Sequence, residues 1–251
     1  MCGRYAITLP PEAVRAFFRY VEQPNFPPRY NIAPTQPVPI VRIERTPLSA
    51  TDRHFRLVRW GLIPAWLKDP KGGPPIINVR SESTLARPSF RAAMLRRRCL
   101  FIADAFYEWQ HLPGSKKARA GRPFLIRRAD RQPMGFAGLW EPWLGADGSE
   151  IETACILTMA ANASVGGIHD RMPAIIAEGD FNAWLDVENV NAEDAAELVG
   201  PIADDALEIF EIGTAINRAA NDGPEVQLPI ARPLPEQPTP EPDEGAQGRL
   251  F

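Results

Sequence analysis

The stretch Cys99-Leu-Phe-Ile-Ala-Asp-Ala-Phe-Tyr-Glu-Trp109 indicates which kind of fold this chain forms. Its apolar part, from Cys99 to Phe106, is the longest strongly apolar run of the sequence, and Asp104 interrupts it. Such a run is too short to span a bilayer, and its aromatic and branched residues are typical of a strand. The stretch therefore predicts a strand-rich globular protein rather than an integral membrane protein.

Short runs of the same type lie on both sides of this stretch. They predict strands at residues 4–8, 38–44, 55–60, 99–103, 124–128, 135–139 and 151–158. Helices are expected at residues 11–21, 81–86, 89–95, 180–186 and 192–199. Because strands are in the majority and do not alternate regularly with long helices, we expect an α+β fold with a mostly antiparallel, barrel-like sheet and flanking helices.

The chain has 251 residues, of which 45% are apolar and 24% charged, as in ordinary globular proteins. No Gly/Ser-rich linker or repeat divides it, so residues 2–232 are expected to form a single domain. Residues 233–251 contain five prolines and four acids among few apolar side chains, and this composition predicts a flexible acidic tail. The first residues lack an apolar signal region, which leads us to expect a cytoplasmic protein.

The three cysteines, Cys2, Cys99 and Cys155, are too few for a disulfide framework and lack the spacing of a structural zinc site. Cys99 and Cys155 lie in apolar runs and are expected to be small core residues. Glycine-rich phosphate-binding motifs are absent. We therefore expect neither a metal nor an organic cofactor.

The net charge of −3 hides a strong asymmetry along the chain. Residues 1–131 carry 24 Lys and Arg against 9 Asp and Glu, whereas residues 132–232 carry 3 against 18. Arginine binds phosphate through its planar fork of donors, so an anionic polymer is a reasonable partner for the first half. Alternatively, the basic half packs against the acidic half and the charges cancel in space. Charge alone does not separate these two interpretations.

Cys2 directly follows the initiator methionine, and its small side chain permits removal of Met1. The new terminus would carry an α-amine with a pKa of about 7.7–8.0 beside a thiol of about 8.5. Such a 1,2-aminothiol condenses with an aldehyde, because the amine forms a Schiff base and the sulfur then closes a thiazolidine ring. In the alternative, Met1 stays and Cys2 is a buried small residue.

Two further segments carry residues suited to nucleic acid. Trp60 and Trp66 flank a Gly and a Pro, so that one can pack in the core while the other lies on a surface bend, although core packing would suit both. Asn78 and Arg80 share one face of an extended segment, which suits a sugar hydroxyl and a phosphate. An ordinary turn before a helix would explain this pair equally well.

Two titratable groups complete the set of candidates. Glu108 is a carboxylate among three aromatic residues, where desolvation would raise its pKa and suit it for proton transfer; a salt bridge to an arginine is the alternative. His169 follows the turn Gly166-Gly167 on a loop before a strand. A structural histidine is the alternative for this residue.

Six motifs, MCGRYA, YNIAPTQ, WGLIPAW, INVRSES, DAFYEW and HDRMP, occur in this order between residue 1 and residue 173. In order and spacing they resemble the SRAP family of abasic-site processing proteins, also called SOS response-associated peptidases. The resemblance covers Cys2 to about Phe210. It implies a single SRAP domain that binds single-stranded DNA and cross-links covalently to the aldehyde of an abasic site.

The resemblance also implies roles for individual residues. Cys2 is expected to be the nucleophile, with Asn78, Glu108 and His169 as supporting catalytic residues. The expected DNA ligands are Arg4, Trp66 and Arg80, with Trp66 stacking on a base. Strand cleavage by β-elimination is a natural side activity of the Schiff base.

Two other classes of function remain open. In a cysteine peptidase, which the older family name suggests, Cys2, His169 and Glu108 would form a Cys-His-acid arrangement that also removes Met1. A noncatalytic reader of single-stranded DNA is the third class. A peptidase has no evident need for a free α-amine or a basic first half, and an aldehyde trap on DNA uses both. We therefore expect a monomer that acts on abasic single-stranded DNA in the DNA damage response, without a membrane partner.

Overall fold

Strands β6 (Arg98–Ala103) and β7 (Ala105–Gln110) are separated by Asp104 alone, yet they belong to two different sheets. The computed structural model describes residues 2–47, 49, 51–69, 73–110 and 121–230. The Asp104 carboxylate lies at the crossing point. It accepts hydrogen bonds from the Thr8 hydroxyl (2.9 Å), the Leu9 amide (2.8 Å) and the Thr8 amide. Asp104 is therefore a structural residue that fixes the start of β7 against the chain leaving β1.

The first sheet closes on itself as a five-stranded barrel. Its members are β3 (Pro37–Ile43), β4 (Arg53–Trp60), β6, β9 (Met134–Leu144) and β10 (Glu150–Ala160). Neighbouring strands pair in the order β4-β3-β6-β9-β10, and β10 pairs with β4 to complete the ring. Only this last pairing of the ring is parallel. The expected barrel-like, mostly antiparallel sheet is confirmed.

Three short strands extend the barrel sheet: β5 (Asn78–Arg80), β11 (Arg171–Pro173) and β12 (Ile175–Ile176). β5 pairs in parallel with β10, β11 pairs antiparallel with β10, and β12 pairs with β9. Strand β10 therefore brings residues near 78 and residues near 171 to the same end of the barrel.

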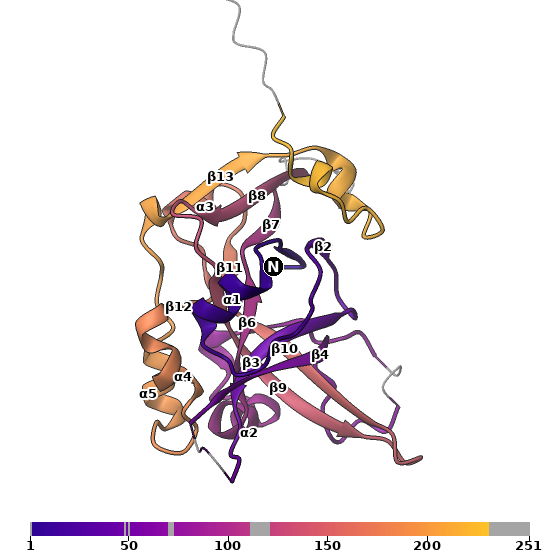
Figure 1. The fold of residues 1–251 in the computed structure, drawn as a ribbon, viewed down its shortest axis with the longest axis vertical. Coiled ribbons are helices and arrows are strands. Elements are labelled where there is room, and N and C mark those ends of the chain that lie inside the picture. Colours follow the sequence, from indigo (N-terminus) through magenta and orange to yellow (C-terminus); the bar gives the residue numbers. More distant parts are fainter. Residues whose placement is uncertain (1, 48, 50, 70–72, 111–120, 231–251) are drawn as a thin grey trace, which may run out of the picture.

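The second sheet is fully antiparallel and lies above the barrel in Figure 1. Its order is β13 (Leu207–Glu211), β8 (Arg122–Arg128), β7, β1 (Arg4–Ile7) and β2 (Arg29–Ile32). The start of β1 and the end of β7 are neighbours in this sheet.

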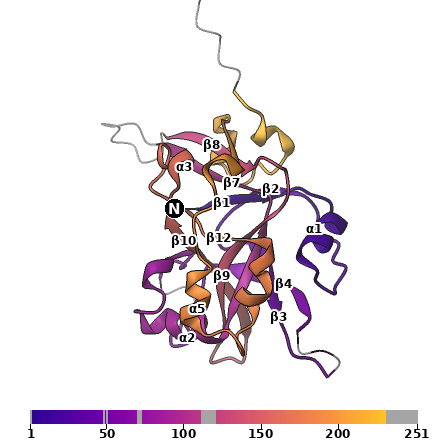
Figure 2. The ribbon, with the colours of Figure 1, turned by 90° about the vertical axis from the view of Figure 1, so that its left-hand side faces the viewer.

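The helices are short and flank the sheets (Figures 1 and 2). The α-helices are α1 (Pro11–Phe18), α2 (Pro88–Arg96), α3 (Ala163–Gly166), α4 (Phe181–Leu185) and α5 (Ala192–Glu197). Single 3-10 turns occur at η1 (Ser81–Ser83), η2 (Glu178–Asp180), η3 (Asp204–Ala206), η4 (Thr214–Asn217) and η5 (Pro224–Gln227).

Two predicted helices are shorter than expected, each for a local reason. The helix expected at 11–21 ends at Phe18, because Arg19 adopts a left-handed conformation with φ of 56°. The segment 81–86 forms only one 3-10 turn, because Arg87 precedes a proline and is held in an extended conformation that no helix can pass through. The strand expected at 135–139 extends over all of β9, whereas β2, β7 and β13 had not been predicted.

The two sheets share a core of aromatic side chains. The Tyr5 ring of β1 meets the Trp60 ring of β4 edge to face at 5.2 Å, and it also contacts Phe101 and Phe136. Cys99 and Cys155 are fully buried, as predicted for core residues. Residues 233–251, the expected tail, lie outside the described residues. No helix of the described part is long and apolar enough to cross a membrane.

Much of the charge asymmetry cancels in space. Eight arginines of the first half form ion pairs with acids of the second half: Arg19–Glu178, Arg29–Asp222, Arg42–Glu152, Arg45–Glu188, Arg97–Glu141, Arg122–Glu211, Arg127–Glu208 and Arg131–Glu208. Net charge along the sequence therefore overstates the positive surface of this fold. A nucleic-acid surface has to be sought among arginines that lack such partners.

Arg98 is 1% exposed and holds the fold together without a carboxylate partner among the described residues. Its guanidinium donates to the carbonyl oxygens of Met94 (2.8 Å), Trp184 (2.6 Å), Asp186 (2.7 Å) and Val190 (2.8 Å). Burial lowers its pKa to about 10. Arg98 thereby ties β6 and α2 to the end of α4 and the loop that follows it.

Replacing Arg98 by methionine should therefore lower the free energy of unfolding by about 3–5 kcal/mol, because the four carbonyls lose their donors inside the protein. The matched control is Arg96→Met, since Arg96 is exposed at the end of α2, two residues before Arg98, and the change there should stay within about 0.5 kcal/mol. Urea unfolding followed by tryptophan fluorescence measures both. Equal stability of the two variants would contradict the structural role of Arg98.

Candidate active site

Cys2 lies two residues before the first residue of β1 and is brought next to Glu108 by strand pairing. β1 runs antiparallel to β7, with Arg4 opposite Tyr107 and Ala6 opposite Ala105. The residues before Arg4 therefore lie opposite the residues after Tyr107. Cys2 has no solvent-exposed surface. Burial raises the pKa of its thiol, and the Glu108 carboxylate acts in the same direction.

Asn78 reaches the same place from the barrel. The Trp60 indole N–H donates to the Ile77 carbonyl at 3.0 Å, and the Trp60 ring packs against Tyr5 of β1. This packing fixes the start of β5 relative to the start of β1. The Asn78 amide Nδ2 then donates to the Cys2 carbonyl at 2.8 Å.

The other end of the Asn78 amide is buried without a partner. Its Oδ1 atom is inaccessible to solvent and accepts no hydrogen bond from the described residues. Unpaired buried acceptors are uncommon, because each one has lost its hydrogen bonds to water. Asn78 therefore anchors Cys2 through the backbone and keeps one acceptor available at the site.

Glu108 is 2% exposed. Burial raises the pKa of its carboxyl group to about 7, and the charge of Asp170 adds to this rise. A carboxyl group with a pKa near 7 exists in both protonation states at neutral pH. It is thus suited to accept and return protons beside Cys2.

His169 lies on the loop between α3 and β11. Its Nδ1 atom is 2.9 Å from the backbone N–H of Arg171, which donates to it, and 2.9 Å from a carboxylate oxygen of Asp170. Because Nδ1 accepts the Arg171 amide, Nε2 is the ring atom left to carry a proton, and these contacts orient the imidazole on its loop.

Two side-chain contacts hold this loop in place. The Gln110 amide at the end of β7 donates to the Gly167 carbonyl at 2.8 Å. On the other side Arg171 forms a two-pronged ion pair with Glu82, at 2.6 and 2.9 Å, and this pair lowers the pKa of Glu82 to about 2. His169 is thus fixed relative to both β7 and η1. The sequence analysis did not predict these two contacts, because each joins residues more than 50 positions apart and no local pattern indicates them.

The three residues expected to bind DNA have different surroundings. Arg80 is exposed at the end of β5, and its guanidinium has no partner among the described residues. Trp66 is 72% exposed, whereas Trp60 is fully buried, so one tryptophan of this motif is core and the other is surface. Arg4 is half-buried, and its guanidinium donates to the Asn31 side chain (2.7 Å) and the Ile216 carbonyl (2.8 Å).

The bend between Trp60 and Trp66 depends on Gly61. Gly61 has φ of 130°, a conformation that L-residues rarely adopt, and a Cβ at this position would lie 2.7 Å from the Cβ of Pro75. Any side chain here would push away the segment that leads to Asn78. Gly61 thus allows the turn that leads to the exposed Trp66 and leaves room for the segment before β5.

Asn31 of the second motif has a structural role. It is fully buried, and its amide donates to the carbonyls of Ile216, Arg218 and Asn221. Asp222 returns the contact by accepting from the amides of Tyr30 and Asn31 at 2.6 and 2.7 Å. The segment carrying η4 is thereby fixed against β2, and the hydrogen bond from Arg4 to Ile216 ties it to β1 as well.

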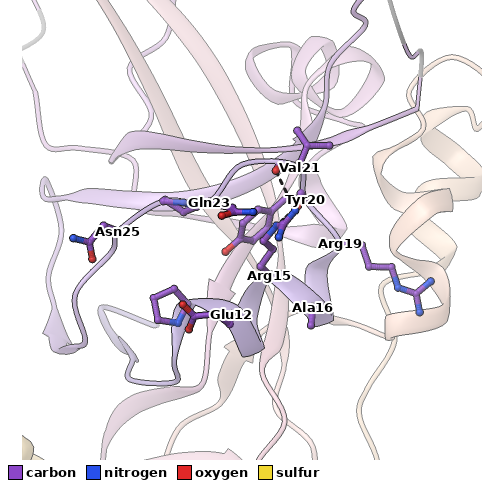
Figure 3. A pocket seen from close by; sticks show the side chains of 10 residues that line it. Glu12, Arg15, Ala16, Arg19, Tyr20, Val21, Gln23 and Asn25 are labelled. Atoms are coloured by element: carbon purple, nitrogen blue, oxygen red, sulfur yellow. Dashed lines mark hydrogen bonds between the residues drawn. The ribbon is translucent and has the colours of Figure 1, made fainter.

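One hollow of the described residues lies away from this site. About 830 Å³ of space lies beside α1, lined by Glu12, Arg15, Ala16, Arg19, Tyr20, Val21, Gln23 and Asn25 among others (Figure 3). In Figure 2 α1 lies on the side of the molecule away from the start of β1. The Arg15 guanidinium is already engaged by the carbonyls of Tyr20 and Val21. No residue of the candidate site lines this hollow. Within the described ranges, no group of three or more His, Cys, Asp or Glu residues is arranged to hold a metal ion.

Comparison with known proteins places these residues in a family context. The sequence model of the SOS response associated peptidase (SRAP) family matches residues 1–219. Abasic site processing protein YoqW of Bacillus subtilis (strain 168) is 31% identical over 229 residues, which cover 90% of this chain and 98% of that protein. Abasic site processing protein HMCES of Xenopus tropicalis is 29% identical over 271 residues, which cover 92% of this chain and 78% of that protein.

Solved structures share the fold. A crystal structure of a protein from Bacteroides thetaiotaomicron superposes with a TM-score of 0.77 at 22% identity and covers 92% of this chain and all of its own. A crystal structure of a protein from Bordetella bronchiseptica superposes with a TM-score of 0.71 at 26% identity and covers 84% of this chain. The barrel with its second sheet is therefore a recurring architecture.

Proposed function

Because this chain belongs to the SOS response associated peptidase (SRAP) family, we propose that it processes abasic sites in DNA by forming a covalent thiazolidine link through Cys2. The observation that carries the proposal is the hydrogen bond from Asn78 to the Cys2 carbonyl, beside the buried carboxyl group of Glu108. The carbonyl remains when Met1 is removed, so Cys2 keeps its anchor while its α-amine becomes free. The substrate is single-stranded DNA that carries the open-chain aldehyde of an abasic site.

The reaction needs only the aminothiol and the aldehyde. The α-amine adds to C1′ of the open sugar to give a carbinolamine, and loss of water leaves a Schiff base. The Cys2 sulfur then bonds to C1′, and the thiol proton is transferred to a base while the nitrogen regains a proton. One aldehyde and one aminothiol thus give one thiazolidine and one water, with no oxidant or reductant.

Each neighbouring group has a task in this sequence. Glu108 takes a proton from the amine or thiol and returns it when water leaves, since its pKa lies near 7. His169 protonates the ring oxygen of the closed sugar on opening and accepts the proton on reversal. Asn78 offers its unpaired Oδ1 to a donor on the amine or the sugar.

β-Elimination competes with ring closure. A Schiff base at C1′ acidifies the C2′ proton, and loss of that proton would cleave the strand on the 3′ side. Fast attack by the Cys2 thiol removes the Schiff base before this happens. Lyase turnover is therefore a side activity whose share depends on the rate of ring closure.

A cysteine peptidase is the less favoured alternative. Its nucleophile is a thiolate, which an adjacent cationic histidine or a helix terminus stabilises. Here burial and the Glu108 carboxylate raise the pKa of Cys2 instead, which keeps the thiol protonated. A peptidase activity would explain removal of Met1 by the protein itself. That removal is a single event, however, and does not require turnover on other peptide substrates. Cytoplasmic location and the monomeric state stay predictions.

Intact-mass measurement tests the proposal directly. The purified protein should begin at Cys2, and after incubation with a single-stranded oligonucleotide that carries one abasic site its mass should rise by the oligonucleotide mass minus one water. The same oligonucleotide reduced to the alcohol at C1′ serves as the control and should give no adduct. Retention of Met1 in the reacting species, or an adduct with the reduced strand, would sink the proposal.

Arg80→Ala should weaken binding of single-stranded DNA by about tenfold at low salt, and the loss should be similar for all sequences, because an exposed guanidinium at the site contacts phosphate rather than bases. The salt dependence of the affinity should fall by about 0.7 in the log–log slope for one phosphate contact. Fluorescence anisotropy at several salt concentrations measures both. Arg45→Ala is the matched control, since Arg45 is also exposed but is paired with Glu188. Unchanged affinity and slope would remove Arg80 from the site.

His169→Ala should slow both formation and reversal of the link, because the ring oxygen needs the same acid and base in both directions. A transfer assay measures reversal: the protein is loaded with labelled abasic DNA, chased with unlabelled abasic DNA, and release is followed. We expect release about 100-fold slower than in the wild type. Release at the wild-type rate would leave His169 as a structural residue.

A further inference from the structure

The sequence after the site is unusually free of acids. Between Glu82 and Asp104 it contains no Asp or Glu, but it contains five arginines: Arg87, Arg91, Arg96, Arg97 and Arg98. Two of these are accounted for by the fold, since Arg97 pairs with Glu141 and Arg98 is buried among carbonyls. Arg87, Arg91 and Arg96 are exposed, and none has an ion pair or side-chain hydrogen bond with the described residues. They contrast with the eight arginines that acids of the second half neutralise.

Helix geometry separates these three arginines into two groups. Arg87 is the residue before the first turn of α2, and the Arg91 amide donates to the Arg87 carbonyl at 3.0 Å, so both belong to the N-terminal flank of the helix with a rise of about 6 Å between them. Arg96 is turned by about 140° from Arg91 and lies on the other flank of the exposed face. No acid precedes or follows them within the first turn of α2. The positive end of the helix dipole reinforces the charge of the first group.

The flank with Arg87 and Arg91 is the one that adjoins the site. Met94, one turn after Arg91, lines a hollow of about 260 Å³ together with Ser81 and Glu82 of η1. η1 begins directly after Arg80, and Glu82 holds the arginine that follows His169 and Asp170. Figure 2 shows α2 on the same side of the molecule as the start of β1. Between Arg80 and Arg87 the only acid is Glu82, whose charge is paired with Arg171, so Arg80 and the exposed arginines at the start of α2 are separated by no unpaired acid of this segment.

Helix α5 limits the path of an anion on this side. Ala196 of α5 and Val199 just after the helix line the same hollow, and α5 carries the exposed acids Glu193, Asp194 and Glu197. Like charges repel a polyanion, so a strand leaving Arg80 is kept off α5 and on the arginine flank of α2.

We infer that Arg87 and Arg91 bind two phosphates of the DNA strand that flanks the abasic site, on one side of that site only. This inference rests on the proposed function for the position of the abasic nucleotide. It adds a second contact surface, formed by Arg87 and Arg91, that the reacting sugar does not touch. A strand that has no nucleotides on that side of the abasic site gains nothing from this surface.

The test uses strands whose abasic position is a tetrahydrofuran, which lacks the aldehyde and keeps binding noncovalent. One strand has about ten nucleotides only on the 5′ side of this position, and the other has them only on the 3′ side. Anisotropy titrations compare the wild type, the double variant Arg87→Ala/Arg91→Ala and the control Arg96→Ala. All three substituted residues are exposed, so the variants should fold.

We expect the double variant to lose about tenfold in affinity for one of the two strands and to lower its log–log salt slope by about 1.4, with little change for the other strand. Arg96→Ala should behave as the wild type. Equal losses for both strands, an equal loss in Arg96→Ala, or no loss would each overturn the inference. The proposed function is tested separately by adduct formation with natural abasic DNA. A protein that forms no adduct but shows the one-sided loss would contradict the proposed function and support the inference.

Discussion

Replacing Cys2 by alanine is expected to abolish the heat-stable adduct with abasic DNA while leaving an adduct that borohydride can trap. The α-amine survives the substitution and still forms the Schiff base, but no sulfur is present to close the ring. Denaturing gel electrophoresis with and without borohydride measures the two species. We expect no detectable stable adduct in the variant, and more strand cleavage than in the wild type, because the Schiff base now persists long enough for β-elimination.

Cys155→Ala is the matched control for this experiment. Cys155 is also fully buried with a pKa raised by burial, but it lies in β10 within the core. This variant should form the stable adduct at the wild-type level. A heat-stable adduct formed by Cys2→Ala without reductant would show that the link is not a thiazolidine.

Glu108→Gln should slow adduct formation by about 100-fold, because the amide keeps the size of the side chain and cannot exchange a proton. In the wild type the rate should rise with pH through an inflection near 7, where the Glu108 carboxyl group ionises and becomes a base. The variant should lose this inflection. Stopped-time gel assays between pH 5 and 9 give the rate profile. An inflection near 7 that persists in the variant would assign the base to another group.

Glu108→Gln should raise the free energy of unfolding at alkaline pH although it slows the reaction. The pKa of Glu108 is raised from an ordinary value of 4.5 to about 7 in the folded state, mainly by burial. Between these values the folded protein holds a proton that the unfolded chain has lost, so the wild type loses stability as pH rises through this window. Glu108→Gln removes that loss and should be the more stable protein at pH 8. Slower chemistry in a more stable variant cannot be explained by unfolding.

The sequence predicted the barrel more completely than the second sheet. Strands β3, β4, β6 and β10 are marked by apolar and aromatic runs, because their residues fill the barrel core. Strand β7 was not predicted, since its segment Ala105–Gln110 mixes core aromatics with the charged Glu108 and lacks the alternation of a half-buried strand. β2 and β13 were missed for a different reason. Their place depends on pairing with β1 and β8, which local patterns do not encode.

The sequence analysis named residues that the fold brings together, but not the contacts that hold them in place. Cys2, Asn78 and Glu108 do meet, and Trp60 and Trp66 divide into one buried and one exposed ring. The contact between Gln110 and Gly167 was beyond prediction, because both groups are ordinary in their local sequence. The same holds for the charge pattern. Only the fold shows that acids neutralise Arg122 and Arg127 while Arg87 and Arg91 keep their charge exposed.

The parallel pairing of β10 with β4 and β5 has a consequence for the newly made protein. Asn78 takes its place beside Cys2 only when Ile156 of β10 lies opposite it, and the contact between Asn78 and residue 156 spans most of the barrel sequence. Parallel pairings over such separations form slowly. A nascent chain of the first hundred residues therefore carries Cys2 without Glu108, without His169 and without the closed barrel. If the proposed function holds, the groups that would direct Cys2 toward DNA join it only after synthesis has passed residue 169.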